Sequence, residues 1–475
     1  MPEASFKKSL VFAAALGVFQ AIATASPVIT GPLPTKVPGD PSHDYPFHSA
    51  PQDLKARGYV EQEFLIAGEA NRYHTENEAN ATVVDRGHHY QTRLLVRRPT
   101  AASRFNGTVI VEWNNVTAGY DIEAAWFQSY DYFIRAGYVW IGLSAQRVGV
   151  EALKRWSPRR YGTLDVTAGG TITNDDLSYD ILADVGRIVR KPVAVDVLGG
   201  LRAQRVFATG WSQSGGRLAT YVNSVHPLGA PMFDAVVLHC AGGAVQIRSD
   251  LSVKVWKLWG ENEVLRSAAT RQPDSANLRN WEVAGASHVD AQLVASAPTV
   301  DTRDGRPVTP SPNPPVEEKC ERPTLSHVPF YQVMNAVFDH LVRWVKDGVP
   351  PPSAPLIETS SINPRAQIRP GVLGNTSPIA RDKLGNALGG IRLAEIAVAT
   401  AVNTGENSGN GFCTLEGAHE DFDAATIATL YPSHAAYVAA VNDVTKKNLK
   451  AGYILKADAD ATIAAAKRTA VGVHQ

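Results

Sequence analysis

The chain has 475 residues, and its 46 Lys and Arg balance 46 Asp and Glu, so the formal net charge is zero. Hydrophobic residues make up 44% and charged residues 19% of the chain, as in a globular protein with a sizeable core. A neutral chain without a basic stripe lacks the charge that neutralises phosphates, so we do not expect a nucleic-acid partner.

Residues 1–25 have the pattern of a secretory signal peptide. Lys7 and Lys8 precede an apolar run from Leu10 to Ile22, and small residues at 23–25 suit cleavage after Ala25. The run is short for a bilayer, which needs about 20 apolar residues; an uncleaved anchor is the alternative. We expect a secreted protein, extracellular or periplasmic, with no stable membrane insertion.

The three cysteines allow at most one intramolecular disulfide. Cys240 lies in an apolar stretch that resembles a buried strand, whereas Cys320 and Cys413 lie in polar, turn-rich sequence. Export permits disulfides, so we expect a Cys320–Cys413 bridge and a free thiol at Cys240.

Apolar strand patterns alternate with helical patterns along the mature chain, which predicts an α/β fold with a mostly parallel central sheet and helices on both faces. The predicted strands are 57–66, 89–98, 107–113, 138–150, 205–210, 233–240, 252–259 and 281–285. The predicted helices are 121–136, about 176–191, about 214–225, the segment from Val328 to Gly348, about 433–450 and about 458–468.

We divide the mature chain into a main domain, 26–350, and a C-terminal extension of the same domain, 351–475. The Pro-rich stretch 299–323 is predicted to be a surface loop. The sequence does not identify a lid over the site; residues 147–175 and parts of the extension are the candidates.

The stretch VFATGWSQSGG, from Val206 to Gly216, has the parts of a nucleophile elbow, in which a strand turns sharply into a helix. Gly210 stands two residues before Ser212, but the strict G-x-S-x-G pattern is broken because Ser214 occupies the second glycine position. The strand ends next to Gly210, which favours Ser212 as the nucleophile over Ser214.

A serine nucleophile needs a base and an orienting acid, and these are expected after later strands, in the order Ser, acid, His. His288 directly follows the strand pattern 281–285. Glu263, three residues after Gly260, is the preferred acid, with Glu261 second and Asp290 a distant third. For the oxyanion hole, we expect the backbone N–H of Gln213 and that of Asn114 or Asn115.

Asn115-Val-Thr also fits a glycan acceptor pattern. A sugar there would crowd the site, so we expect this acceptor to be unused. Trp211, beside Ser212, is expected near the acyl group of a substrate.

No cofactor is expected. Neither a phosphate-binding loop nor a His-Glu-x-x-His pattern occurs, and His88 and His89 are predicted to be surface residues.

Several motifs give the chain a resemblance to the α/β-hydrolase superfamily, and more narrowly to a secreted "alpha/beta hydrolase domain-containing" family. They are Val111-Glu-Trp-Asn-Asn-Val116, Ser178-Tyr-Asp-Ile181, Gly210-x-Ser-Gln-Ser-Gly215, Trp281-Glu-Val-Ala-Gly-Ala286 with His288, and Gly385-Asn-Ala-Leu-Gly-Gly-Ile-Arg392. The G-x-S-x-x-G turn is also similar to that of glucuronoyl esterases. The resemblance implies an α/β-hydrolase fold and a serine hydrolase, and names no substrate.

Three functions are compatible with these residues. The first is a secreted serine esterase of the carboxylic ester hydrolase type, acting through Ser212, Glu263 and His288 on a small-molecule or carbohydrate ester. The second is a peptidase or amidase with the same triad. The third is a non-catalytic binding protein built on a hydrolase scaffold.

Overall fold

The structure, a computed structural model, describes residues 26–76, 78–241, 245–305, 318–360, 363–369, 372–376 and 378–473. The expected signal peptide therefore lies outside the described residues. No helix in the described ranges is both long and apolar enough to cross a membrane.

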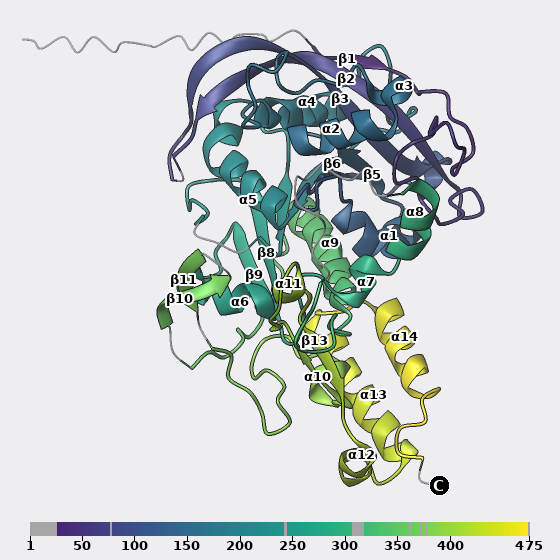
Figure 1. The fold of residues 1–475 in the computed structure, drawn as a ribbon, viewed down its shortest axis with the longest axis vertical. Coiled ribbons are helices and arrows are strands. Elements are labelled where there is room, and N and C mark those ends of the chain that lie inside the picture. The colour runs from purple at the N-terminus through teal and green to yellow at the C-terminus, as the bar shows by residue number, and fades with distance from the viewer. Residues whose placement is uncertain are drawn as a thin grey trace, which may run out of the picture.

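A nine-stranded sheet forms the centre of the molecule, in the order β1-β2-β3-β5-β4-β6-β7-β8-β9 (Figure 1). From β5 to β9 all neighbours are parallel, whereas β1, β2 and β3 are antiparallel to each other and β3 is antiparallel to β5. The strands are β1 (Val28–Thr30), β2 (Tyr59–His74), β3 (Thr82–Pro99), β4 (Thr108–Trp113), β5 (Val139–Leu143), β6 (Arg205–Trp211), β7 (Ala235–His239), β8 (Lys254–Gly260) and β9 (Leu278–Val283). The predicted mostly parallel sheet is confirmed.

Two hydrophobic clusters cover the two faces of the sheet, because successive side chains of a strand point to opposite faces. In β4, Val109 and Val111 belong to one cluster and Ile110 to the other, and all three are fully buried. The first cluster receives α2 (Arg147–Trp156), α4 (Ser178–Arg190) and α5 (Gln213–Thr220), and the second receives α1 (Ala124–Ala136) and α9 (Phe330–Asp347).

Shorter helices and the extension complete the fold. They are α3 (Pro158–Tyr161), α6 (Glu261–Ser267), α7 (Ala291–Val294), α8 (Ala297–Asp304), α10 (Ala394–Ala397), α11 (Cys413–Glu416), α12 (Ala424–Leu430), α13 (His434–Ala451) and α14 (Lys456–Ala466). Two small antiparallel pairs join β10 (Asn363–Arg369) to β11 (Val372–Thr376) and β12 (Ala401–Thr404) to β13 (Ala418–Asp421).

Three segments differ from the sequence predictions. The strand predicted over 138–150 ends at Leu143, and α2 begins at Arg147, where the apolar residues take helical spacing. Part of the predicted loop 299–323 is the end of α8, with Pro298 in its first turn, where a missing N–H costs nothing. The loop expected after Gly260 is the first turn of α6, since the Glu263 side chain accepts the Gly260 N–H at 2.9 Å.

The extension is attached to the last strand of the sheet. Ile391 forms a parallel bridge with Val283 of β9, through hydrogen bonds of 2.7 Å to the Glu282 carbonyl and 3.1 Å from the Ala284 N–H. Buried residues of α10, α13 and α14, together with Val398 and Tyr431, form a third, smaller cluster, against which partly buried residues of α12 pack. In Figure 1 the extension, green to yellow, lies below the sheet next to α9.

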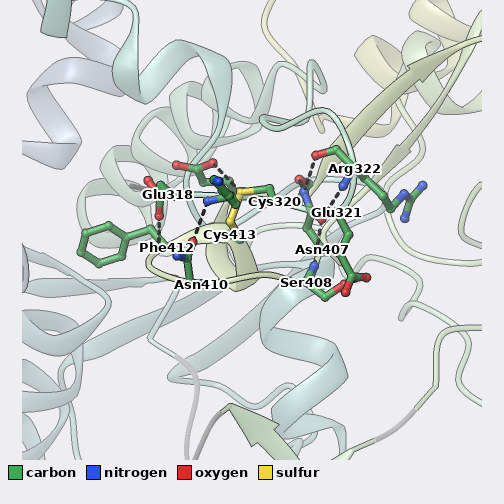
Figure 2. The surroundings of a disulfide bond; sticks show 12 residues. Glu318, Cys320, Glu321, Arg322, Asn407, Ser408, Asn410, Phe412 and Cys413 are labelled. Atoms are coloured by element: carbon green, nitrogen blue, oxygen red, sulfur yellow. Dashed lines mark hydrogen bonds between the residues drawn. A yellow bond between two sulfur atoms is a disulfide. The ribbon is translucent and has the colours of Figure 1, made fainter. Parts of the chain in front are cut away.

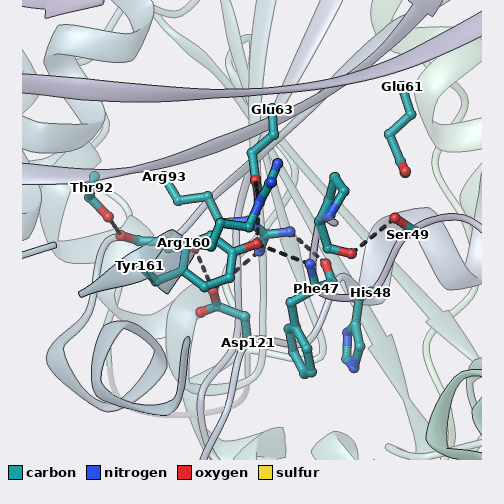
Figure 3. Close-up of polar contacts among 12 residues, drawn as sticks. Phe47, His48, Ser49, Glu61, Glu63, Thr92, Arg93, Asp121, Arg160 and Tyr161 are labelled. Carbon is teal, nitrogen blue, oxygen red and sulfur yellow. Dashed lines mark hydrogen bonds and ion pairs between the residues drawn. The ribbon is translucent and has the colours of Figure 1, made fainter. Parts of the chain in front are cut away.

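A buried ionic network joins the N-terminal segment to the sheet (Figure 3). The Glu63 carboxylate accepts hydrogen bonds from Arg93 Nε and Arg160 Nε, each at 2.5 Å, and from the Tyr161 hydroxyl at 2.7 Å. Arg93 also donates to the Phe47 carbonyl at 2.6 Å. Because buried charges need such partners, the network fixes the segment around Phe47 against the sheet.

Candidate active site

The turn between β6 and α5 holds Ser212 in an unusual backbone conformation. Its φ is 56° and its ψ is −119°, a region that a residue with a Cβ rarely adopts. The Ser212 N–H donates to the His239 carbonyl at 2.9 Å, and the Ser212 carbonyl accepts the Gly216 N–H at 2.9 Å. These bonds hold the strained residue between strand and helix, as in a nucleophile elbow.

Two glycines explain why the broken motif still forms this turn. A Cβ on Gly210 would lie 2.9 Å from backbone atoms of Ser214 and Gly215, and a Cβ on Gly215 would lie 2.8 Å from the Gly210 carbonyl oxygen. A Cβ on Gly216 would meet nothing within 4 Å. The close backbone approach is therefore between Gly210 and Gly215, and a small residue suffices at position 214.

Ser214 is turned away from the site. Its side chain is fully buried, its Oγ donates to the Trp211 carbonyl at 3.0 Å, and it accepts the Trp211 N–H at 3.1 Å. Ser212, in contrast, is half-buried and lines a cavity. Of the two serines in the turn, Ser212 is the one placed to meet a ligand.

His288 and Glu263 lie against each other at the ends of β9 and β8. His288 Nδ1 is 2.5 Å from Glu263 Oε1, and the two side chains are 7% and 3% exposed. Glu263 Oε2 accepts the Gly260 N–H, so the carboxylate is held from both sides. With Nδ1 engaged by the carboxylate, Nε2 is the nitrogen left to exchange a proton with a ligand or a hydroxyl.

The imidazole and the Ser212 hydroxyl share one cavity. Both residues line it, and the Trp211 ring lies 4.9 Å from the His288 ring, centroid to centroid. In the described chain no hydrogen bond joins Ser212 Oγ to His288. Nucleophile–base contacts are often longer in unliganded enzymes and tighten when substrate binds.

The two other candidate acids have structural partners. Glu261 is fully buried, accepts hydrogen bonds from Arg381 and from the Thr404 hydroxyl, each at 2.6 Å, and does not line the cavity. Asp290 caps α7 through the Leu293 N–H at 2.7 Å and accepts from Gln128 at 2.9 Å. Burial raises the pKa of Asp290 to about 6. Neither carboxylate is bonded to His288.

The free thiol lies directly beneath this pair. Ligand atoms of Cys240, Glu263 and His288 lie within 4.8 Å of one another, and no other group of three such residues in the described chain meets this criterion. Burial and the Glu263 charge raise the thiol pKa of Cys240 well above its usual value. The disulfide between Cys320 and Cys413 and the free Cys240 are confirmed.

The Gln213 N–H, the first oxyanion donor expected from sequence, lies at the start of a helix. Gln213 is the first residue of α5, and the first N–H groups of a helix have no partner within it. The other expectation is wrong for this conformation. The Asn114 N–H donates to the Leu143 carbonyl at 3.2 Å and the Asn115 N–H to the Ile122 carbonyl at 3.1 Å. Both are consumed because the chain after β4 continues pairing, through an isolated bridge between Asn115 and Ile122.

Asn115 instead supports the turn from the side. Its Nδ2 donates to the Trp211 carbonyl at 2.9 Å, and its Oδ1 accepts the Thr117 N–H at 2.8 Å. The side chain is 1% exposed. That the glycan acceptor at Asn115 is unused remains a prediction, and burial gives it a physical reason.

The cavity beside Ser212 has a volume of about 330 Å³. Most of its lining is apolar, including Ile122 and Phe127 from around the start of α1, Leu293 and Val294 from α7, and Val300 from α8. His48, from the segment fixed by the buried ionic network, lines it too. No described residue of the lid candidate 147–175 lines it.

The extension supplies another wall, which is joined to the main domain by the disulfide (Figure 2). Cys320 and Cys413 are 93 residues apart in sequence. Next to them, Glu318 on one segment and Phe412, Leu415 and Glu416 on the other line the cavity. Of the two lid candidates, the extension is therefore the one that lines the cavity.

Sequence reasoning missed these wall residues. Asp301, Glu318 and Glu416 lie in segments without a catalytic pattern, and the placement of the disulfide was the signal that could have found the last two. A polar segment that a disulfide joins to a distant part of the chain must lie over some part of the domain.

A doubly wound sheet with a strained serine after the central strand, and a His–Glu pair after later strands, defines the α/β-hydrolase fold class. A family model described as "Alpha/beta hydrolase domain" matches residues 29–464. The chain belongs to this alpha/beta hydrolase family. The match includes most of the extension, so the extension is part of the family's sequence pattern. A search of curated proteins found no significant match.

Solved structures with partial similarity are also hydrolases. A protein assigned as a dienelactone hydrolase, from Klebsiella pneumoniae subsp. pneumoniae MGH 78578, is 14% identical, with a TM-score of 0.21, over 46% of this chain and 85% of that one. XC6422 from Xanthomonas campestris, an α/β serine hydrolase without a lid, is 12% identical, with a TM-score of 0.28, over 46% of this chain and 92% of that one. Methylesterase BT1017 is 13% identical, with a TM-score of 0.27, over 50% of this chain and 46% of that one. Similarity this low carries no argument for the activity of this chain.

Proposed function

We propose that the protein is a secreted serine hydrolase that cleaves carboxylic esters through Ser212, His288 and Glu263. The observation that carries the proposal is the shared cavity: a serine in a strained elbow and a histidine bonded at 2.5 Å to a buried glutamate line the same space. Membership of the alpha/beta hydrolase family supports it.

In the proposed reaction, Ser212 Oγ bonds to the ester carbonyl carbon while its proton moves to His288 Nε2. Glu263 stabilises the imidazolium that forms. The bond from that carbon to the alcohol oxygen then breaks, and the leaving oxygen takes the proton from Nε2. Water repeats the sequence on the acyl-enzyme: it gives a proton to Nε2, its oxygen bonds to the carbonyl carbon, and Ser212 Oγ leaves with the proton.

The negative charge on the carbonyl oxygen needs two donors. We assign one to the Gln213 N–H. For the other we assign the Val116 N–H, because it lies in the same loop as Asn114 and Asn115 and donates to no backbone acceptor among the described residues.

The test compares wild type with Ser212→Ala, using a short acyl nitrophenyl ester and a matched nitroanilide. We expect ester cleavage to fall at least about a thousandfold in the variant, and labelling by a fluorophosphonate to disappear. Undiminished activity in Ser212→Ala would refute the assignment. Nitroanilide cleavage as fast as ester cleavage would favour a peptidase or amidase, and an inert wild type would favour a non-catalytic role.

Secretion is part of the proposal and has its own test. The disulfide supports it, because such bonds persist in oxidising compartments. Expressed from the full sequence, the exported protein should begin at Ser26. If the protein is recovered only in the membrane fraction, with residues 1–25 still part of the chain, the proposal of secretion is contradicted.

A further inference from the structure

The cavity beside Ser212 has an uneven distribution of charge. Three carboxylates line it, from Asp301, Glu318 and Glu416, and no Lys or Arg is among its described lining residues. Its other titratable residues include His48 and His288. Among the described lining residues, a ligand in this space therefore meets carboxylates and no lysine or arginine.

Two of the carboxylates form one acidic wall at the disulfide. Glu318 lies two residues before Cys320 and accepts a hydrogen bond from the Phe412 N–H, next to Cys413 (Figure 2). Glu416 lies three residues after Cys413, in α11. Both residues line the cavity, and burial first, and then the Glu318 charge, raise the pKa of Glu416.

The remaining lining is apolar and aromatic, including Phe127, Tyr120 and Phe412. Such a surface binds hydrocarbon by removing it from water, and aromatic faces also attract cations. A carboxylate-bearing ligand would lose its hydration here and would face like charges instead.

We infer that the acidic wall makes this site selective for apolar esters that are uncharged or carry a cationic group, and that it disfavours esters bearing a carboxylate. The inference rests on the proposed function and names the substrate class of the same cavity. Glu318 and Glu416 are its specificity-determining residues, and they contact the part of the substrate distant from the reacting carbonyl.

The experiment uses three nitrophenyl esters of similar length: the butyrate, the monoester of glutaric acid, and the ester of 4-(trimethylammonio)butyric acid. For wild type we expect kcat/KM for the carboxylate-bearing ester to be at least about tenfold below that for the butyrate. The trimethylammonio ester should match or exceed the butyrate. Raising the salt concentration to about 0.5 M should bring the three values closer together, since screening weakens charge effects.

The double variant Glu318→Gln/Glu416→Gln should reduce the preference for butyrate over the glutarate monoester by about tenfold. In Glu318→Gln the side-chain amide oxygen can still accept the Phe412 N–H, so the wall keeps that bond. Glu321→Gln is the matched control: it lies on the same segment, removes the same charge and does not line the cavity. It should leave the preference at its wild-type value.

Equal rates for the carboxylate and neutral esters in wild type would overturn the inference, as would an unchanged preference in the double variant. These failures are distinct from failure of the proposed function, which Ser212→Ala tests on the neutral ester alone. If Ser212→Ala loses butyrate cleavage and wild type cleaves all three esters at equal rates, the proposed function stands and the proposed selectivity is wrong.

Discussion

The Ser214 hydroxyl donates to the carbonyl of Trp211 at 3.0 Å, and this bond distinguishes a structural serine from Ser212, the half-buried serine that lines the cavity. The same oxygen accepts the Trp211 N–H, so Ser214 closes the end of β6 onto the start of α5. Ser212 is left at the cavity.

Replacing Ser214 with Ala should therefore affect stability more than chemistry. The substitution removes the two buried hydrogen bonds of the Ser214 hydroxyl to the Trp211 backbone, which are worth about 0.5–1.5 kcal/mol each. We expect urea unfolding to show this loss, while ester cleavage stays within about tenfold of wild type because the Ser212 hydroxyl is untouched. Loss of labelling by a fluorophosphonate in folded Ser214→Ala would contradict the assignment.

Glu263 and Glu261 should respond differently to the same substitution. Glu263→Gln removes the charge beside the imidazole, and kcat should fall about 10²–10⁴-fold with the fold retained. Glu261→Gln leaves Arg381 with Glu406 as its remaining charged partner and should cost about 1–3 kcal/mol in stability, with only a small change in kcat. Kinetics combined with urea unfolding of both variants checks the contrast, and an exchange of the two outcomes would make Glu261 the acid.

His239 should make the folded state sensitive to acid. Its ring is buried, and burial, followed by the charge of His288, lowers its pKa to about 3. The ordinary pKa of histidine is about 6.5, so between these values the unfolded chain binds more protons than the folded one. Stability therefore falls as pH falls through this window.

Between pH 7.5 and pH 5 this histidine should account for a loss of about 2 kcal/mol in the free energy of unfolding. Over the same pH range, the free energy of unfolding of His239→Gln should fall by about 2 kcal/mol less than that of wild type. His74→Gln, whose ring is exposed, is the control and should follow wild type. Parallel pH curves for wild type and His239→Gln would show that the ring is not buried in its neutral form.

The disulfide should hold the cavity wall as well as the fold. Closing a loop of 93 residues is worth about 4.6 kcal/mol in the chain-entropy account. Cys320→Ser/Cys413→Ser should lower stability by up to this amount and raise KM for a butyrate ester more than it lowers kcat. Cys240→Ser, measured in parallel, leaves the bridge intact, and an identical KM effect there would argue against a role for the bridge.

Glu63 should be among the most sensitive positions outside the site. Glu63→Gln leaves the Arg93 and Arg160 guanidinium groups buried beside a neutral amide, and breaking such a network costs about 3–5 kcal/mol. Asp460→Asn, in an exposed pair with Lys456, should change stability by less than about 1 kcal/mol. Thermal unfolding of the two variants gives the comparison.

The central sheet and the turn at Ser212 could be predicted because local patterns encode them. Apolar runs mark buried parallel strands, and Gly210 marks the turn. The placement of His288 and Glu263 followed from strand order. Where a strand or helix ended was less readable, as with α2 beginning at Arg147 instead of continuing a strand.

The cavity wall could not be predicted, because its residues come together only through tertiary contacts. His48 reaches the site through the network around Glu63, and both residues lie far from Ser212 in sequence. Glu416 reaches it through the disulfide. The Asn114 N–H is engaged by the Leu143 carbonyl of β5 and the Asn115 N–H by Ile122, and no periodicity in that loop predicts either pairing.

The cross-linked wall and the reacting groups occupy separate parts of the chain. Ser212, Glu263 and His288 follow strands of the sheet, whereas Glu318 and Glu416 lie on connecting segments held by one covalent bond. Mutations can therefore accumulate in those segments without disturbing the serine, histidine and glutamate. Diverging relatives that share this turn can in this way acquire different substrate preferences while retaining the same reaction.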